Sequence, residues 1–131
     1  RKASNGKVVV AASVQGNQHD LGVRMVCDYF EMEGWRAIYL GANVPGHDLA
    51  LAVEHFACDL LCLSAYLPTQ LRAVEDTIET TRGHDAGRRC KVLVGGPAFF
   101  GADVLWREIG ADGFAQSAQD AVSVGARLVG L

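Results

Sequence analysis

Features that mark three classes of protein are missing from this chain of 131 residues. Its 12 Lys and Arg residues do not cluster and its formal net charge is −3, so we expect no direct contact with nucleic acid. No apolar run approaches the length that crosses a membrane, and we recognise no signal peptide. Internal repeats and low-complexity tracts are also absent. These absences leave a cytoplasmic globular protein as the expectation.

The chain has few cysteines, and none lies close to another in the sequence at the spacing of a CxxC motif. None of the 4 cysteines forms a CxxC pair, and all fall in apolar stretches, at positions 27, 58, 62 and 90. We therefore expect four reduced, buried thiols, since zinc or disulfide frameworks have little support. The chain opens at Arg1 without a methionine. We expect residues 1–131 to form a single domain, with 131 residues too few for two, cut from a larger protein.

What is present is an alternation of apolar runs with helical patterns. The expected strands are residues 7–14, 35–40, 59–64, 91–94 and 113–115. The expected helices are residues 21–34, a segment from about 48 to 57, a segment marked by Leu71, Val74 and Ile78, and residues 103–109 and 120–131. In the first helix, Leu21, Met25 and Tyr29 fall at helical spacing and predict an apolar stripe. Residues 41–46 read as a loop and 83–89 as a mobile polar connector.

This rhythm predicts an α/β fold with a parallel sheet and helices on both faces. Five strands in this order favour the flavodoxin-like (Rossmann-like) arrangement, strand order 2-1-3-4-5. Ligands of such sheets bind beyond the carboxyl ends of the strands, in the crevice between strands one and three. The loops that meet there contain Asn17, His19 and Asp20, then Ser64, Tyr66 and Leu67, then Gly95, Gly96 and Pro97.

Several functions known for this fold fit these loops badly. A phosphate-accepting receiver domain needs a carboxylate after the third strand, where this chain has Ser64. The first loop lacks the hydroxyls and glycines of a flavin phosphate site, and no GxGxxG follows the first strand. The simpler interpretations of the same residues are a structural histidine at a helix start, a Ser64 that only caps a backbone group, and glycines that only form a turn.

The three loops together resemble the cobalamin-binding domain family. That family has DxHxxG after the first strand, SxL after the third and GG after the fourth. The corresponding segments here are NQHDLG (Asn17–Gly22), Ser64-Ala65-Tyr66 with Leu67 one position late, and Gly95-Gly96. The segments RAIYLGANVP (Arg36–Pro45) and GADG (Gly110–Gly113) also look typical of the family. The resemblance extends from about Lys7 to Leu131.

The resemblance implies that the dimethylbenzimidazole tail of cobalamin leaves cobalt and enters the crevice, while His19 binds cobalt from below. It implies that Ser64 hydrogen-bonds the tail and that Gly22, Gly95 and Gly96 leave room for it. It also implies that the loop after the second strand contacts the corrin edge, and that the start of the last helix contacts the nucleotide end. The cofactor-binding residues expected on this basis are Asn17, His19, Asp20, Leu21, Gly22, Val44, Pro45, Ser64, Tyr66, Leu67, Gly95, Gly96, Pro97 and Ser117.

Two departures from the family pattern stand out. Asn17 replaces the usual acid, so the histidine loses a charged partner and we expect a weaker cobalt–nitrogen bond. Tyr66 stands where leucine is usual, and its ring could pack on the tail.

The stretches LSAYLP (Leu63–Pro68) and HDLGVRM (His19–Met25) look closer to the regulatory members of the family than to methyltransferase carriers. We therefore expect a sensory module, responsive to light through adenosylcobalamin, with a helical cap upstream and a regulatory protein partner. Two different interpretations stay open: a corrinoid carrier domain of a methyltransferase, and a cofactor-free interaction domain. The expected cofactor is cobalamin, as adenosylcobalamin, methylcobalamin or hydroxocobalamin. No nucleophile–base pair or pair of carboxylates lies in these loops, so we expect binding rather than catalysis by this chain alone.

Overall fold

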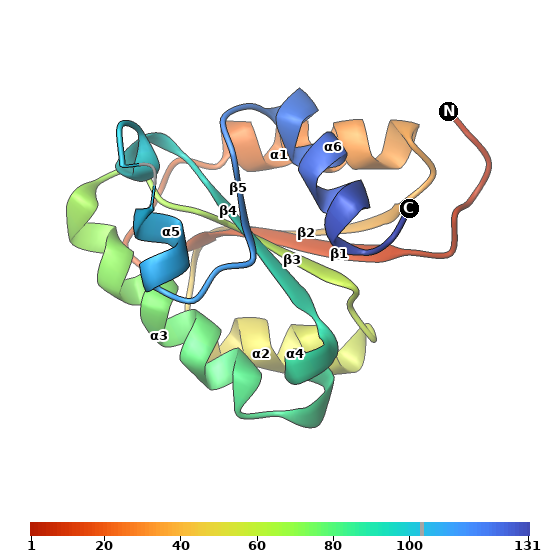
Figure 1. Ribbon diagram of the computed structural model, residues 1–131. Helices are drawn as coiled ribbons and strands as arrows, with labels where there is room; N and C mark the ends of the chain where they lie inside the picture. The colour runs from red at the N-terminus through yellow and green to blue at the C-terminus, as the bar shows by residue number, and fades with distance from the viewer. Residues whose placement is uncertain (103) are drawn as a thin grey trace.

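The computed structural model describes residues 1–102 and 104–131 and consists of one parallel sheet between two layers of helices (Figure 1). The strands are β1 (Val8–Val14), β2 (Arg36–Val44), β3 (Leu60–Ser64), β4 (Lys91–Gly95) and β5 (Gly113–Ala115). They are ordered β2-β1-β3-β4-β5, and each neighbouring pair is parallel. The predicted fold class and strand order are therefore confirmed.

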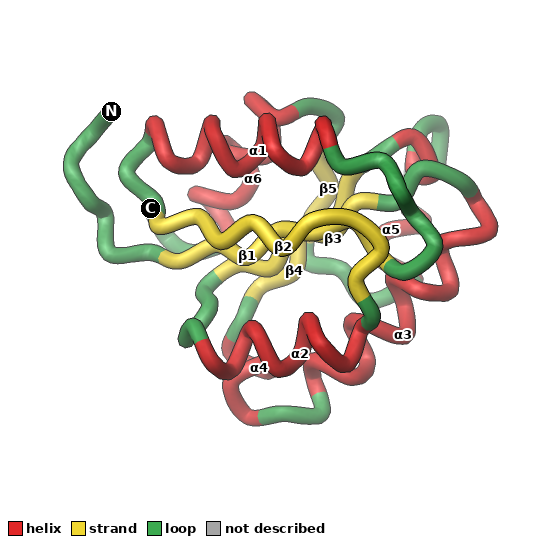
Figure 2. The backbone as a smooth tube through the Cα atoms, turned by 180° about the vertical axis from the view of Figure 1, so that it is seen from behind, coloured by secondary structure: helices red, strands yellow, loops and turns green. Residues whose placement is uncertain are grey.

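The helices divide between the two faces of the sheet. They are α1 (Leu21–Met32), α2 (Gly46–His55), α3 (Leu71–Arg82), α4 (Asp85–Arg89), α5 (Leu105–Glu108) and α6 (Ala118–Leu128), with short 3-10 turns η1 (Pro68–Gln70) and η2 (Pro97–Phe99). Helices α1 and α6 lie side by side on one face, and α2, α3 and α4 cover the other (Figures 1 and 2). None of the helices in the described residues is long and apolar enough to cross a membrane.

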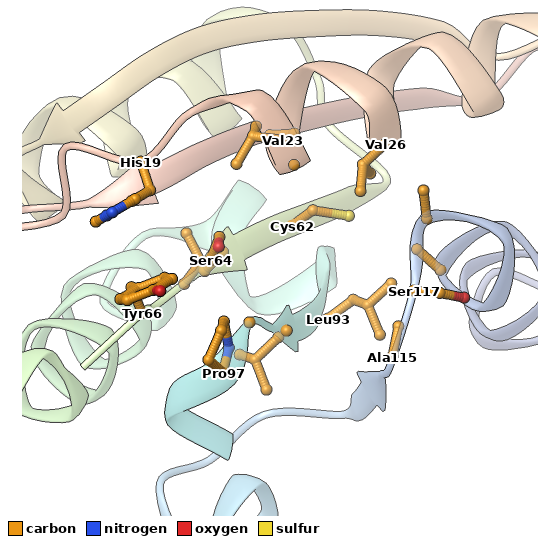
Figure 3. A pocket seen from close by; sticks show the side chains of 18 of the residues that line it. His19, Val23, Val26, Cys62, Ser64, Tyr66, Leu93, Pro97, Ala115 and Ser117 are labelled. Carbon is orange, nitrogen blue, oxygen red and sulfur yellow. The ribbon is translucent and has the colours of Figure 1, made fainter. Parts of the chain in front are cut away.

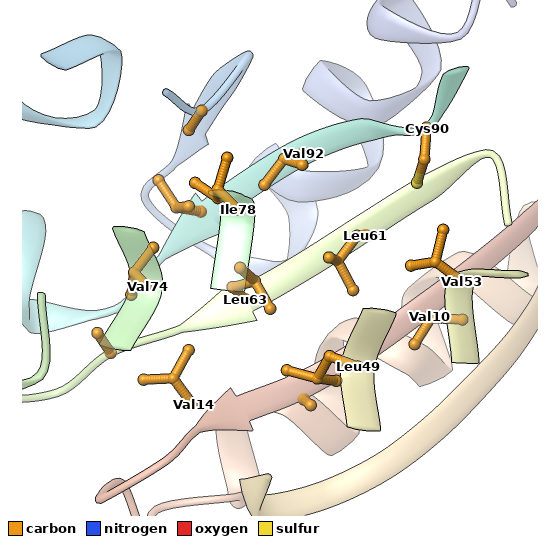
Figure 4. Packing of buried hydrophobic residues seen from close by; sticks show 14 of the residues in the cluster. Val10, Val14, Leu49, Val53, Leu61, Leu63, Val74, Ile78, Cys90 and Val92 are labelled. Atoms are coloured by element: carbon orange, nitrogen blue, oxygen red, sulfur yellow. The ribbon is translucent and has the colours of Figure 1, made fainter. Parts of the chain in front are cut away.

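Strand β1 is buried along nearly its whole length because both of its faces meet helices. Val10 and Val14 point into the core under α2 and α3, whereas Val9 and Ala11 point toward α1 and α6. Figure 4 shows the first of these two cores, where Leu49 of α2 and Val74 of α3 pack on the sheet. The unbroken run of small and β-branched residues is explained by this two-sided burial.

The sheet edge at β2 extends further than expected. Residues 41–44 continue the strand, although we predicted a loop over 41–46. The register with β1 shifts after Ala11 and again after Ala12, so the strand bends while it stays paired. Gly41 adopts a φ of 93° and Asn43 a φ of 55°, conformations that read as turn signals in a sequence.

Three further segments differ from expectation. Residues 85–89 form α4 instead of a polar connector, because Gly87 is buried against α3, where an added Cβ would lie 1.7 Å from the Thr81 carbonyl oxygen. The last helix begins at Ala118, two residues earlier than predicted, and ends at Leu128. Of the predicted helix 103–109 the structure shows Leu105–Glu108 as α5, and Asp103 lies outside the described residues.

The predicted apolar stripe of α1 is wrong in its direction. The helix buries Val23, Cys27 and Phe30, whereas Leu21 and Met25 are exposed. The spacing of the buried residues is equally helical, so periodicity alone did not say which stripe faces the sheet. Two β-branched side chains of α1, Val23 and Val26, border a space beneath the first turns of the helix.

Candidate functional site

A cavity of about 620 Å³ opens at the carboxyl edge of the sheet and runs inward beneath α1 and α6. Its floor is made by side chains of four neighbouring strands, Ala11, Cys62, Leu93 and Ala115. Its roof includes Val23 and Val26 of α1 and Ala118 and Ala121 of α6. His19, Ser64 and Tyr66 stand at the mouth (Figure 3). The interior is mainly apolar, and polar groups gather at the entrance.

His19 is exposed at the mouth and is oriented by Asn17, which is only 1% exposed. The Asn17 Oδ1 atom accepts the His19 backbone N–H at 3.0 Å and lies 3.3 Å from His19 Nδ1. The Asn17 Nδ2 atom donates to the Ser64 carbonyl oxygen at 3.1 Å. One amide therefore links the loop after β1 to the end of β3.

These contacts favour one tautomer of His19. Since Asn17 Nδ2 faces a carbonyl oxygen and Oδ1 faces a backbone N–H, the amide cannot be flipped without two donor–donor or acceptor–acceptor clashes. Oδ1 can therefore only accept at Nδ1, and the tautomer that fits this contact has its proton on Nδ1. Nε2 then keeps its lone pair and points away from Asn17.

The face of the imidazole is covered by Tyr66. The two ring centroids lie 4.0 Å apart and the planes meet at 10°, a stacked pair. Ser13 Oγ donates to the His19 carbonyl oxygen and so anchors the backbone of the same residue from below. The side chain of His19 is restrained at its edge and on its face, and its backbone at both ends.

The loop that presents His19 is tied to two neighbouring elements. The buried Gln70 donates through Nε2 to the Gly16 carbonyl oxygen and accepts the Tyr66 and Leu67 amides at Oε1. On the other side, Asn43 Oδ1 accepts the Gly16 N–H at 2.8 Å. The loops after β1 and β3 and the end of strand β2 therefore form one connected rim.

The charged groups beside His19 contact Tyr39 of β2. Asp20 Oδ2 accepts the Tyr39 hydroxyl at 2.6 Å, and the Arg24 guanidinium lies 5.7 Å from the centre of the Tyr39 ring. The hydrogen bond to Asp20 raises the pKa of Tyr39. Burial raises the pKa of the Cys62 thiol in the cavity floor well above its usual value, so this sulfur stays protonated at neutral pH.

The glycines of the site have different reasons to be glycine. An added Cβ at Gly22, in the first turn of α1, would meet no atom within 4 Å, although Gly22 lines the cavity. Gly96 has a φ of 102°, and a Cβ there would lie 2.2 Å from the Ala65 carbonyl oxygen. Gly22 is thus compatible with a space that a ligand fills, whereas Gly96 is required by the backbone itself.

Comparison with known proteins identifies the family. A model described as the B12 binding domain matches residues 7–124. The chain belongs to the B12-binding domain family. A corrinoid protein of Desulfitobacterium hafniense (strain Y51) is 31% identical over 128 residues, covering 97% of this chain and 57% of that protein. Dimethylamine corrinoid protein 3 of Methanosarcina acetivorans is 32% identical over 117 residues, covering 88% of this chain and 54% of the relative. The chain thus spans about half the length of these relatives.

The solved structures agree with this assignment. A cobalamin-binding protein from Desulfitobacterium hafniense DCB-2 superposes with a TM-score of 0.87 at 26% identity, covering 95% of this chain and 60% of that one. The expected cofactor class, a corrinoid, is supported by the B12-binding family match; its chemical form is not fixed by it.

The predicted branch of the family was wrong. The relatives described above are named corrinoid proteins, one of them a dimethylamine corrinoid protein, so they do not support a light-responsive sensory module or a regulatory partner. The motifs LSAYLP and HDLGVRM misled because single substitutions beside a shared motif, such as Tyr66, say little about what lies outside the domain.

Most residues expected at the cofactor do meet in one place. His19, Asp20, Leu21, Gly22, Ser64, Tyr66, Gly95, Gly96, Pro97 and Ser117 line the cavity. Asn17 stands behind His19, and Val44, Pro45 and Leu67 do not line the cavity. The Ser117 Oγ accepts the Asp120 N–H at 3.0 Å and caps α6. The Ser64 hydroxyl lines the cavity and makes no hydrogen bond within the described residues.

Sequence reasoning missed the cavity walls and the rim. Cys62, Leu93 and Ala115 give no signal because they look like ordinary core residues of buried strands. Gln70, which the structure shows to be buried, gave only a weak signal in the sequence. It is a polar residue just before the helical positions 71, 74 and 78. Only the fold, which aligns four strands side by side, reveals that small side chains leave a slot.

The residues present fit a corrinoid. His19 offers one neutral nitrogen donor, which suits a metal ion whose other positions a macrocycle fills. The open direction at Gly22 and the apolar slot suit a flat aromatic group, and the Ser64 hydroxyl stands at the mouth with its hydrogen-bonding capacity unused by the described residues. The site thus holds both a metal donor and room for a bulky appendage.

Proposed function

We propose that this domain is the corrinoid carrier of a cobalamin-dependent methyltransferase system. The observation that carries the proposal is His19 held with Nε2 free at the mouth of an apolar slot of about 620 Å³. The names of the relatives support a carrier role over a cofactor-free interaction domain. A bound corrinoid would supply a cobalt–carbon bond that can be made and broken, and so would carry a methyl group.

In this proposal His19 would hold the cobalt through Nε2, and Asn17 would fix the tautomer of its imidazole. Nε2 binds only when it is unprotonated, so a proton and the metal compete for the same lone pair. Because Asn17 carries no charge, it orients the imidazole without the added basicity that a carboxylate would give. These residues would hold the imidazole in a fixed orientation and leave its basicity moderate. A donor of this kind suits a carrier whose metal has to change its coordination.

The rest of the site would hold the nucleotide tail in the slot. Val23, Cys62 and Leu93 would surround the aromatic base, and Ser64 would hydrogen-bond it at the mouth. Val44 and Pro45 stay predicted contacts of the corrin edge, Leu67 a predicted contact of the cofactor, and Ser117 a predicted contact of the nucleotide end. With a corrinoid bound, the apolar slot would exclude water from the base, and His19 would hold the metal.

We propose residues 1–131 as one cobalamin-binding domain that acts with other parts. A helical segment would cover the upper side of the corrin, and a partner methyltransferase would deliver or accept the methyl group. The chain alone would bind and present the cofactor and would not complete the reaction. The four free thiols favour a cytoplasmic location.

The test is reconstitution with hydroxocobalamin and methylcobalamin followed by desalting and visible spectroscopy. We expect a retained corrinoid whose spectrum shows the benzimidazole displaced and an imidazole bound. His19→Gln should keep the fold, as judged by circular dichroism, and lose the imidazole signature. A colourless wild-type protein, or a spectrum indifferent to His19→Gln, would refute the proposal.

The carrier role is tested separately from binding. The domain loaded with methylcobalamin is incubated with methyltransferases that act on methylated amines or methanol, and loss of the methyl–cobalt absorption is followed. Transfer in either direction with one of them supports the carrier. A loaded domain that is inert with every methyltransferase, and that changes its oligomeric state in light, would overturn the carrier role.

A further inference from the structure

The stacked pair of Tyr66 and His19 is a feature that the family pattern does not explain. The pattern has leucine at this position, and leucine offers no ring face. In this chain the two rings lie 4.0 Å apart and nearly parallel at 10°, one from the loop after β3 and one from the loop after β1 (Figure 3). The side chain of Tyr66 is 42% exposed, so it is not needed to complete the core.

The contact with Asn17 is a weak restraint by itself. The distance from Nδ1 to Asn17 Oδ1 is 3.3 Å, beyond the usual range for an N–H···O hydrogen bond. A single bond at one edge of an imidazole leaves the ring free to tilt about that bond. A partner against the ring face removes this tilt, and Tyr66 is the aromatic residue that stacks on His19 in the described structure.

Tyr66 is itself held in place by its backbone. Its N–H donates to Gln70 Oε1 at 2.8 Å, and the N–H of the preceding Ala65 donates to the Gly95 carbonyl oxygen at 3.1 Å. Its phenol hydroxyl makes no hydrogen bond within the part of the chain that the structure describes. The ring, and not the hydroxyl, is therefore the part that acts on His19.

We propose that Tyr66 is a positioning residue that fixes the plane of the His19 ring, so that Nε2 is presented to the corrinoid already oriented. The inference rests on the proposed role of His19 as the lower ligand. It assigns Tyr66 a task other than packing on the nucleotide tail, which was the expectation from the sequence. An oriented donor loses less conformational freedom on binding, and the stacked form of the free protein is the form that binds.

The stack also offsets the change from acid to amide at position 17. A carboxylate would hold the Nδ1 proton with a charge-assisted bond, which is shorter and stronger than the bond to an amide oxygen. With Asn17 that edge is held more loosely, and a face contact supplies the missing restraint. Asn17 and Tyr66 therefore act as a pair, and their effects are not additive.

The experiment compares Tyr66→Phe and Tyr66→Leu with wild type and with Thr69→Ala, a control at an exposed position of the same loop. The first readout uses the free protein: ¹⁵N chemical shifts of His19 report the tautomer and the ring environment. The second uses hydroxocobalamin reduced to the Co(II) state, where electron paramagnetic resonance reports the nitrogen ligand. The third is the fraction of corrinoid bound with imidazole as pH is lowered.

We expect Tyr66→Phe and Thr69→Ala to match wild type within about twofold, because stacking survives in both. Tyr66→Leu should reduce the imidazole-bound fraction, relative to the imidazole-free bound form, by about 2- to 10-fold, the value of one aromatic pair. It should still bind corrinoid through the slot, and its His19 signals should report a mobile ring before any corrinoid is added. In combination with Asn17→Ala, the loss should exceed the sum of the two single losses.

Two results would overturn the inference and leave the proposed function standing. One is a Tyr66→Leu protein with wild-type nitrogen signals, and the other is a Tyr66→Phe protein as impaired as Tyr66→Leu. In both cases the wild-type spectrum still depends on His19. If wild type fails to retain corrinoid, or if His19→Gln leaves the nitrogen signal unchanged, the proposed function itself fails, so the two failures are distinguishable.

Discussion

At the scale of single residues, the positions of hydrogen-bond donors and acceptors determine how His19 is oriented in the site. Asn17 is buried and uses both ends of its amide, so it determines that His19 exposes Nε2. An aspartate could keep the bonds to His19 but would turn a carboxylate oxygen toward the Ser64 carbonyl oxygen. The asparagine is therefore suited to the local structure of this chain, independently of its effect on the metal.

The first prediction concerns Asn17→Asp. We expect the free protein to lose about 1–3 kcal/mol of unfolding free energy, since the Ser64 carbonyl loses its donor in a buried position. The corrinoid-bound protein should show a stronger bond from cobalt to nitrogen, because a carboxylate makes the imidazole more basic. Urea unfolding measures the first effect and the Co(II) nitrogen coupling the second. An unchanged cobalt spectrum and affinity would show that the charge at position 17 does not matter.

The second prediction separates the two kinds of glycine. Gly22→Leu should leave the stability of the free protein nearly unchanged and weaken corrinoid binding by roughly 10- to 100-fold, because overfilling a packed space costs about 1–3 kcal/mol. Gly96→Ala should instead destabilise the free protein by about 1–3 kcal/mol through its φ and the clash with Ala65. Thermal melts and corrinoid titrations distinguish them. Equal loss of stability in both variants would contradict the assignment of Gly22 to ligand space.

At the scale of elements, loops meet because parallel strands end at one edge. This part of the site was predictable: the alternation of strands and helices in the sequence already places His19, Ser64 and Gly95 together. The walls were not predictable, because the direction of the α1 stripe and the length of β2 depend on packing and on bulges. Periodicity gives two possible faces for α1, and only contact with α6 selects Val23 and Cys27.

The third prediction tests the rim between the loops. Gln70→Leu should leave the amides of Tyr66 and Leu67 and the Gly16 carbonyl without their hydrogen-bond partner. This loss should loosen both loops and lower the affinity for a corrinoid. Gln70→Glu keeps an acceptor for the two amides and loses the donor to Gly16, so its effect should be intermediate. Hydrogen exchange of the Tyr66 and Leu67 amides measures the loosening. If both variants exchange as wild type does, Gln70 does not join these loops.

At the scale of the whole molecule, two hydrophobic cores lie on the two faces of one sheet, and they differ in their relation to the cavity. The core under α2, α3 and α4 is filled by large side chains such as Leu49, Leu61 and Val74. The core under α1 and α6 also contains large side chains, such as Phe30 and Trp35, but small ones, Ala11, Cys62 and Ala115, lie where its strands border the cavity. The fold class followed from the sequence, but this asymmetry did not, because a small buried residue reads the same whether it is closely packed or borders a cavity.

The cysteines in these cores make stability depend on pH in the alkaline range. Burial, helped by Asp28 and Glu31, raises the pKa of Cys27 to about 11, from 9.0. Burial also raises the pKa of Cys62, and the contact with Cys58 followed by burial raises that of Cys90. Between pH 9 and 11 the unfolded chain has released protons that the folded chain still holds. The unfolded state then binds fewer protons, so the free energy of unfolding falls as pH rises.

The fourth prediction follows from this sign. Cys27→Ala should be less stable than wild type at pH 7, since it leaves a small void, but should lose less of its stability between pH 9 and 11. Urea unfolding of both proteins at a series of pH values gives the two slopes, and their difference removes the contribution of lysine and tyrosine residues common to both. Parallel slopes would mean that the Cys27 thiol ionises as readily in the folded protein as in the unfolded one. Because the thiols stay protonated and uncharged at neutral pH, the core that borders the slot remains apolar in the range where a corrinoid would bind.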